Sequence, residues 1–334
     1  MPVLSVGDMA QQFISMRNSS TIKTELADLA ESMSSGRVTD VTRTLNGDTV
    51  RLSGLVYSLS QLDGYQQAVT ETTQILAGMQ AVLGQVDTMR ADTAEQLLLV
   101  SDESTLSQVN EAARAARDRF GEMVTVLNTQ IADRALMSGT SVDSQSLANP
   151  EDMLADMQTA IGGATDFATI EAAIDTWFDD PAGGFATMGY QGDTGAIAQR
   201  RVSDTNTVRL DARADDPAIK ETLKGAAMAA MANDLTGLDQ ATKATLLKEA
   251  GAALFTASSE LIGVRTRIGA AEAEVAQTET EMNAQRTSFE IARSNLVAAD
   301  PFDTASRLQS VQLQLETHYS VTARLSQLSL LRYI

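Results

Sequence analysis

The sequence contains no cysteine and only one histidine, and these two shortages exclude most metal and redox chemistry. Without cysteine there is no disulfide, no thiolate nucleophile and no zinc–thiolate site. With His318 alone, a two-histidine metal site is impossible, and a serine–histidine pair would depend on that single residue. We therefore expect no metal and no cofactor, and we expect the protein not to be an enzyme.

Aromatic and basic residues are also scarce. Aromatic residues make up 4% of the chain, so a core must consist mainly of aliphatic residues and methionine. The 25 Lys and Arg residues face 44 Asp and Glu residues, which gives a net charge of −19 at pH 7. This charge repels phosphate groups, so we expect neither nucleic acid nor a membrane surface as a partner. The chain shows no run of about 20 apolar residues for a membrane helix, and no secretory signal peptide is recognisable at its start.

Helical periodicity is the strongest pattern that is present. Proline is absent from residues 3–149 and 218–300, and apolar residues recur every seven positions from Leu247 to Leu296. An amphipathic helix cannot bury such a row alone, so its simplest partner is another long helix of the same chain. The predicted core of this rod comprises Leu62, Val69, Leu76, Leu83, Phe120, Leu254, Leu261, Ile268, Val275, Met282, Phe289 and Leu296.

These patterns predict a mainly α fold: a long antiparallel helical coiled coil or bundle, formed as a rod by the N- and C-terminal segments, with a small α+β domain inserted in the middle. The rod is assigned to residues 46–140 and 246–299, and the insert to residues 141–245. If residues 247–299 form one continuous helix, it is about 80 Å long at roughly 1.5 Å per residue.

Local signals within the insert predict two helix starts and a hairpin. A capping residue followed by proline marks the starts at Asn149-Pro150 and Asp216-Pro217. Two short β-like runs in residues 197–211 predict a hairpin.

Two polar motifs could carry chemistry, and a structural role is favoured for both. Gly189–Gly195 has glycine at every third position, as in a phosphate cradle, but no P-loop lysine follows, so a turn is favoured. The pairs Asp179-Asp180 and Asp215-Asp216 could form an acid/base couple, but both precede proline in turn-like sequence, where aspartate caps backbone groups.

His318 and the pair Trp177-Phe178 also have two interpretations each. His318 could bind a metal, but a histidine at the surface or in an interface is favoured because no second ligand of that kind exists. Trp177-Phe178 could anchor a binding partner, although a position in the core of the insert is favoured.

Amphipathic stripes also occupy both ends of the chain, and neither has an obvious intramolecular partner except the other. We assign residues 1–45 and 300–334 to a terminal helical assembly domain that meets neighbouring subunits. Its predicted interface residues are Met9, Phe13, Met16, Ile22, Leu26, Leu29, Met33, Leu308, Val311, Leu315, Tyr319, Leu325 and Leu328.

Four short segments, in order along the chain, resemble motifs of the bacterial flagellin family and its hook-associated members. Leu26–Arg37 (LADLAESMSSGR) resembles "LssGkrI", and Arg134–Thr140 (RALMSGT) resembles "yLFsGt". Gly189–Asp193 (GYQGD) is similar to "YqGd", and Leu325–Ile334 (LSQLSLLRYI) is similar to "iSqLSLFdYl". The family's usual "SDDPaG" is replaced by DVTRTLNG at residues 40–47.

The resemblance implies a structural subunit of the bacterial flagellum, located where the hook meets the filament and assembled through its terminal helices. Its partners would be further copies of itself, the preceding hook-associated junction protein and flagellin, with an export chaperone at the C-terminal segment. It would be extracellular, after export without a cleaved signal peptide. Residues 1–45 and 300–334 would be disordered or loosely ordered in the monomer and would form an inner helical coiled coil on assembly.

Three alternatives to this function remain. The least favoured is an enzyme, which would be recognised by a cleft that gathers carboxylates from distant segments. A filament flagellin is the closest, although the short insert and the Tyr333-Ile334 ending favour the hook-associated members. A cytosolic coiled-coil scaffold protein, from a different class, would keep its ends ordered without forming a polymer.

Overall fold

The chain folds into long helices with two small pairs of strands. The computed structural model describes residues 6–101 and 103–331, with side chains described for residues 9–10, 12–101 and 103–324. The predicted mainly α fold with a small β portion is confirmed. None of the helices in this described part combines the length and hydrophobicity that a membrane span requires.

The chain divides into two compact units. The first, here called the terminal unit, comprises residues 1–63 and 283–334, and the second, the central unit, comprises residues 64–282. This division cuts through two long helices and differs from the three parts predicted above, whose boundaries therefore stay a prediction.

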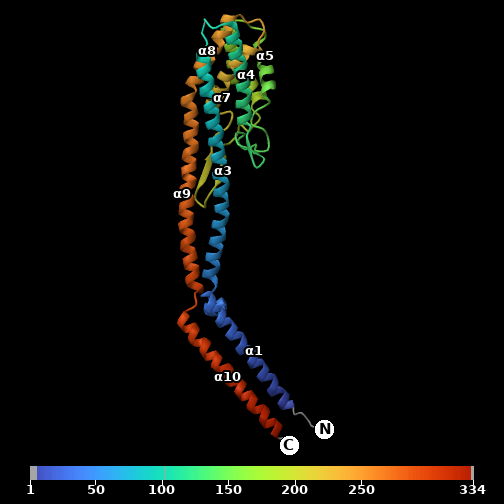
Figure 1. Cartoon of the computed structure of the whole chain (residues 1–334), viewed down its shortest axis with the longest axis vertical. Helices are drawn as coiled ribbons and strands as arrows, with labels where there is room; N and C mark the ends of the chain where they lie inside the picture. The colour runs from blue at the N-terminus through green and yellow to red at the C-terminus, as the bar shows by residue number, and fades with distance from the viewer. Residues whose placement is uncertain (1–5, 102, 332–334) are drawn as a thin grey trace. The chain divides into compact units, whose positions relative to one another are not determined.

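The terminal unit is built around two helices that lie side by side and run antiparallel (Figure 1). Aspartates begin two of its helices: Asp40 Oδ1 accepts a hydrogen bond from the Arg43 backbone N–H at 2.9 Å, and Asp300 Oδ1 accepts one from the Phe302 backbone N–H at 2.8 Å. The helices are α1 (Val6–Ser35), α2 (Val41–Thr44) and α10 (Pro301–Leu331), with the first turns of α3 (Val50–Leu98) and the last turns of α9 (Ser258–Val297).

The two connecting segments of the terminal unit are joined by backbone hydrogen bonds. Arg37 and Ala298 form an antiparallel β-bridge. The Val38 N–H donates to the Val297 carbonyl at 2.9 Å, and the Ala299 N–H donates to the Gly36 carbonyl at 3.0 Å. The segment that leaves α1 is thereby held against the segment that enters α10.

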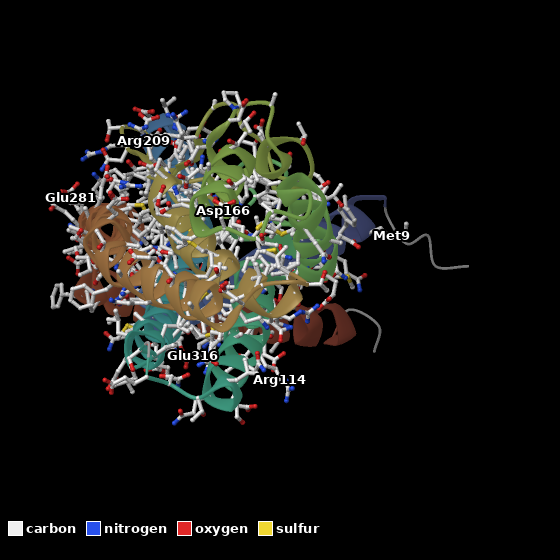
Figure 2. All side chains as sticks on the ribbon, turned by 90° about the horizontal axis from the view of Figure 1, so that it is seen from above. Met9, Arg114, Asp166, Arg209, Glu281 and Glu316 are labelled. Atoms are coloured by element: carbon white, nitrogen blue, oxygen red, sulfur yellow. The ribbon has the colours of Figure 1, made fainter. Side chains whose placement is uncertain are left out.

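The central unit contains the larger hydrophobic core. Its charged side chains, such as Arg209 and Glu281, project outward from the ribbon (Figure 2). Besides most of α3 and α9, its elements are α4 (Leu106–Leu127), β1 (Gln130–Ile131), β2 (Arg134–Ala135), α5 (Pro150–Ile161), α6 (Phe167–Asp179), the π-helix η1 (Phe185–Gly189), β3 (Ala198–Arg201), β4 (Thr207–Leu210), α7 (Pro217–Asp234) and α8 (Gln240–Thr256).

The local predictions for this unit are confirmed. Helix α5 begins at Pro150, where the Asn149 side chain accepts a hydrogen bond from the Glu151 N–H at 2.9 Å. Helix α7 begins at Pro217 and is capped by Asp216. Strands β3 and β4 form the predicted antiparallel hairpin, with Ala198 opposite Leu210 and Arg201 opposite Thr207.

Helix α7 lies at the centre of the unit rather than at its margin. It packs against α4 and α8, and most of its length is buried. Its segment from Gly225 to Ala232 consists almost wholly of glycine and alanine with two methionines, and these small side chains allow neighbouring helices to approach closely. The region predicted as an insert therefore supplies part of the same core as the rod helices.

The predicted helix over residues 247–299 is not continuous. It is broken at Ala257, between α8 and α9. At the end of α8 the Leu254 carbonyl accepts a hydrogen bond from Arg90 Nη1 at 2.8 Å, while Arg90 Nε donates to Asp87 Oδ1 at 2.9 Å. A buried arginine from α3 thus satisfies a carbonyl at the break, a contact that seven-residue spacing does not reveal.

The predicted rod core remains largely in place across this break. Gln66 Nε2 on α3 donates to Glu279 Oε1 on α9 at 3.0 Å, and Gln80 Nε2 donates to the Arg265 carbonyl at 2.7 Å. The predicted core residues that are buried are Leu62, Val69, Leu76, Leu83, Phe120, Leu254, Leu261, Ile268, Val275 and Met282. The remaining two, Phe289 and Leu296, lie in the terminal unit and are only partly buried.

Candidate assembly surface

The pair formed by α1 and α10 buries only one side of each helix. Ile22 on α1 and Val311 on α10 are buried. Leu26, Leu29, Leu308 and Leu315 from the same stripes are partly buried. These six predicted interface residues are therefore used, at least in part, within one chain. In the described part of both segments, α1 and α10 are helices that pack on each other. The expected gain of order on assembly stays a prediction.

A second set of apolar residues on the same helices faces outward. Phe13 is 67% exposed and Phe302 is 83% exposed. Met9, Phe13 and Met16 are spaced four and three residues apart, and this spacing places them on one face of α1. Large exposed apolar residues that gather on one element are typical of an interaction surface. The exposed set comprises Met9, Phe13, Ile14, Met16, Met33, Phe302, Leu313, Tyr319 and Val321.

Sequence reasoning found only part of this outward set. Met9, Phe13, Met16, Met33 and Tyr319 were predicted interface residues, and each is exposed. The residues missed were Ile14, Phe302, Leu313 and Val321. One pattern could have indicated them: each is a large apolar residue of α1 or α10 that lies outside the predicted row of apolar residues on its helix. The predicted residues Leu325 and Leu328 lie outside the residues whose side chains are described.

Polar contacts fix the pairing of the two helices. Ser15 Oγ lies 3.4 Å from His318 Nε2, and the Lys23 ammonium lies 5.7 Å from the centre of the Tyr319 ring, within cation–π range. His318 is thus a partly buried residue of the helix interface. No group of three or more histidine, aspartate or glutamate side chains in the described residues could hold a metal ion.

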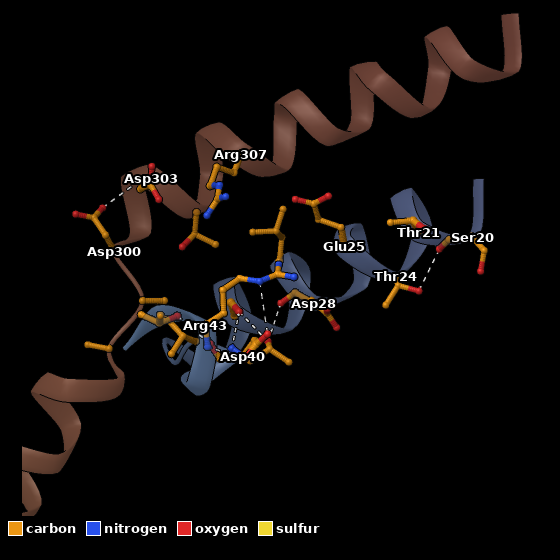
Figure 3. Close-up of a pocket in the computed structure, with 18 of the residues that line it drawn as sticks. Ser20, Thr21, Thr24, Glu25, Asp28, Asp40, Arg43, Asp300, Asp303 and Arg307 are labelled. Carbon is orange, nitrogen blue, oxygen red and sulfur yellow. Dashed lines mark hydrogen bonds and ion pairs between the residues drawn. The ribbon is translucent and has the colours of Figure 1, made fainter. Parts of the chain in front are cut away.

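A polar cavity of about 690 Å³ lies where α1, α2 and the start of α10 meet (Figure 3). Thr39 Oγ1 donates to the Asp28 carbonyl at 2.9 Å, and Ser32 Oγ lies 2.8 Å from Thr39 Oγ1, so the wall on the side of α1 is tied together by hydrogen bonds. The charged residues that line the cavity are Arg17, Glu25, Asp28, Asp40, Arg43, Asp300, Asp303 and Arg307.

This cavity is the place where an acid/base couple would be sought, because it gathers carboxylates from distant segments. Two of these carboxylates already have structural roles: Asp40 caps α2 and pairs with Arg43 at 3.7 Å, and Asp300 accepts hydrogen bonds from the first backbone N–H groups of α10. Asp28 and Asp303 are exposed to solvent. The residues around the cavity therefore connect α1, α2 and the start of α10 through caps and hydrogen bonds. This arrangement does not favour catalysis.

The glycine-rich motif of the central unit forms a tight loop. A Cβ atom on Gly192 would lie 2.4 Å from the Tyr190 hydroxyl and 2.7 Å from the Ser138 carbonyl, so only glycine fits there. The Asp193 side chain accepts hydrogen bonds from the Thr140 hydroxyl and from the Gly195 N–H, and these bonds lower its pKa. The motif is a structural turn packed on residues 138–146.

The two acidic pairs are occupied by structural contacts. Asp216 caps α7, and Asp180 Oδ1 accepts a hydrogen bond from the Ala182 N–H at 2.8 Å. Asp179 forms ion pairs with lysines of α7, including Lys224 at 3.0 Å. The side chain of Asp215 pairs with Arg213 at 2.9 Å, and burial raises its pKa despite this neighbour.

Trp177 and Phe178 lie in an aromatic core, as favoured from the sequence. The Trp177 and Phe178 rings meet edge to face with centroids 4.8 Å apart, and Phe185 stacks on Phe178 at 5.4 Å. Trp177 Nε1 donates to Asp156 Oδ2 at 2.7 Å, which satisfies the polar atom of a buried indole.

Comparisons with known proteins agree with this architecture. Residues 252–334 match the family described as the bacterial flagellin C-terminal helical region. A crystal structure of FlgL from Bacillus cereus has a similar fold, with a TM-score of 0.52 and 11% identity, over 72% of this chain and 99% of that one. A search of curated proteins gives no significant match.

A second solved structure is similar to the same degree. A putative flagellar hook-associated protein from Vibrio parahaemolyticus matches with a TM-score of 0.52 and 13% identity, over 75% of this chain and 99% of that one. At these identities the likeness concerns the fold, while the C-terminal match concerns the sequence. Residues 252–334 are thus similar in sequence to the bacterial flagellin C-terminal helical region, in a chain whose fold is similar to that of the two solved flagellar proteins.

Proposed function

We propose that the protein is a non-enzymatic structural subunit of the bacterial flagellum that assembles with copies of itself through α1 and α10. The observation that supports this function is the outward apolar set on these two helices, which the chain itself leaves uncovered. Burial of apolar surface is the main driving force of association, at roughly 25 cal/mol per Å². Contacts that repeat from copy to copy without closing produce a helical assembly.

We further propose that the subunit lies at the junction between hook and filament. The C-terminal region matched to flagellins and the fold shared with hook-associated proteins support this position. Its neighbours would be the preceding hook-associated protein and flagellin, and an export chaperone would bind the C-terminal segment before assembly. The protein would then be extracellular, exported without a cleaved signal peptide.

Substitution of the outward residues tests the assembly role. Phe13→Gln and Leu313→Gln should leave the far-UV circular dichroism of the full-length protein unchanged, because both side chains are exposed. Sedimentation of assembled material should fall strongly in both variants. The control is Val311→Gln at a buried position, which should weaken the helix pair itself. Assembly that survives both outward substitutions would contradict the assigned surface.

Deletion of residues 300–334 is the larger version of this test. The central unit has its own core, so the truncated protein should remain helical while it loses assembly. If the truncated protein still joined hooks to filaments in motile cells, the terminal helices would not have the proposed role.

The position in the flagellum can be tested with a deletion strain. Loss of a junction subunit should leave hooks that release flagellin monomers, whereas loss of filament flagellin should leave junctions without filaments. Recovery of the protein from the cell body rather than from sheared flagella would favour a cytosolic scaffold.

A further inference from the structure

The methionines of this chain are distributed unevenly between interior and surface. The sequence has 14 methionines and no cysteine. Nine of them are buried, and Met188 is partly buried. The three exposed methionines among the described side chains all lie on α1: Met9 at 62% exposure, Met16 at 61% and Met33 at 47%. Figure 2 shows Met9 projecting from that helix.

These three residues also belong to the outward apolar set. Met9 and Met16 are seven residues apart, two helical turns, and flank Phe13 on the same face. A methionine side chain is flexible and polarizable, which suits an interface that must adapt to several neighbours. The same thioether is also the group in this chain that an oxidant attacks most readily, since no thiol is present.

We propose that Met9, Met16 and Met33 form an oxidation-sensitive site through which peroxide blocks the assembly of the free subunit; this inference rests on the proposed assembly function. Each thioether sulfur donates an electron pair to one oxygen of hydrogen peroxide. The O–O bond breaks, an S–O bond forms, and the sulfur is oxidised to the sulfoxide. The proton of the attacked oxygen passes to the other oxygen, which leaves as water. The products are a methionine sulfoxide and water, so no further reactant is needed.

The sulfoxide changes the surface that assembly uses. It replaces an apolar thioether by a strongly polar, chiral group that water solvates well. Burial of that group against a neighbouring copy without a hydrogen-bond partner is unfavourable. The fold of the chain itself should survive, because the methionines of the core, such as Met123, Met137 and Met153, are fully buried. Once copies have assembled, the α1 methionines should be covered and protected.

The first experiment measures the selectivity of oxidation on the full-length protein. The free protein is treated with dilute hydrogen peroxide, and each methionine-containing peptide is followed by mass spectrometry. Sulfoxide should form at Met9, Met16 and Met33 on the order of tenfold faster than at buried Met123 and Met137, because oxidation follows exposure. Equal rates at buried and exposed methionines would overturn the proposal.

The second experiment links oxidation to assembly. Peroxide should reduce sedimentable material from the wild-type protein at least several-fold, and a methionine sulfoxide reductase with dithiothreitol should restore it. The triple variant Met9→Leu, Met16→Leu, Met33→Leu keeps an apolar surface, so it should assemble both before and after treatment. The matched control Met188→Leu should remain as sensitive as the wild type.

The outcomes separate this inference from the proposed function. If untreated wild-type protein and the triple variant both fail to assemble under all conditions, the assembly function is wrong, and the inference falls with it. If both assemble and peroxide inhibits them equally, assembly stands and the methionine site is wrong. Complete sulfoxide formation at all three positions without loss of assembly would also overturn the site.

Discussion

The terminal unit and the central unit use the same amphipathic spacing with different results. In the central unit, Leu76 and Leu83 of α3 are fully buried. Beside them α3 contacts α9 through the Gln80–Arg265 hydrogen bond, and the side chains of Ile131 and Leu136 lie against Gly78. In the terminal unit, α1 and α10 have each other as their main neighbour, so each can bury only one stripe. A row of apolar residues therefore becomes core where more than one segment of the chain packs on it, and stays partly exposed where a single helix does.

The largest expected effect tests the buried side of this comparison. Phe120→Ala removes a fully buried ring from the central core and should lower the free energy of unfolding by about 3–5 kcal/mol, measured by urea denaturation. Phe13→Ala should change it by less than about 0.5 kcal/mol, because that ring is exposed. Similar losses in both variants would mean that α1 is packed as tightly as the central core.

Substitution of Arg90 tests whether its hydrogen bond to the Leu254 carbonyl stabilises the break between α8 and α9. Arg90→Met should cost about 1–3 kcal/mol, because the Leu254 carbonyl and Asp87 lose a buried donor. The control is Arg114→Met, which removes an exposed pair with Glu111 and should cost less than about 1 kcal/mol. Equal free energies of unfolding for the Arg90 variant and the wild type would show that water can replace Arg90 as the donor to the Leu254 carbonyl.

Removal of one helix cap in each unit should have a smaller effect on the free energy of unfolding. Asn149→Ala and Asp300→Ala should each cost about 1 kcal/mol at the start of α5 and α10 respectively. Hydrogen exchange should show the first change within the central unit and the second within the terminal unit. Faster exchange in both units after either substitution would indicate that the two units unfold as one.

The smallest effect concerns pH and the central unit. Burial raises the pKa of Asp215 above the ordinary value of 3.8, so the folded chain holds this proton more tightly than the unfolded chain does. This group therefore lowers stability as pH rises from about that value through its raised pKa. Asp215→Asn should remove this component from thermal unfolding measured against pH.

Asp239 provides the opposite slope as a control. Its pKa is lowered by the hydrogen bond from the Thr242 N–H at the start of α8, so its contribution is lost as pH falls through the lowered pKa. Asp239→Asn should therefore flatten the acid side of the profile. A profile for Asp215→Asn identical to that of the wild type would contradict the role assigned to its burial.

Sequence reasoning succeeded where the determinants are local. The helix starts at Pro150 and Pro217 depend on a cap and a proline that are adjacent in the chain, and the β3–β4 hairpin depends on two short runs around a turn. The buried rows of α3 and α9 follow from spacing within one helix. Of the four motifs that resemble the flagellin family, Leu325–Ile334 lies within the match over residues 252–334, and the other three stay predictions.

The features that were missed depend on contacts between distant residues. The break at Ala257 involves a donor from α3, 164 positions away from the carbonyl that it satisfies. The central position of α7 depends on its packing against α4 and α8, and the residues of α7 alone do not predict which helices pack on it. The exposure of Phe302 and Leu313 could not be read from their apolar character alone, because exposure depends on which other segments of the chain pack nearby.

The β-bridge between Arg37 and Ala298 has a mechanical consequence for the terminal unit. Its backbone hydrogen bonds join the segment that follows α1 to the segment that precedes α10. A pull on either helix passes along the covalent chain and also through these hydrogen bonds, so part of the load is shared with the other helix. Helices α1 and α10 should therefore respond to load together. The backbone hydrogen bonds between the two segments should break first, because they are weaker than the covalent chain.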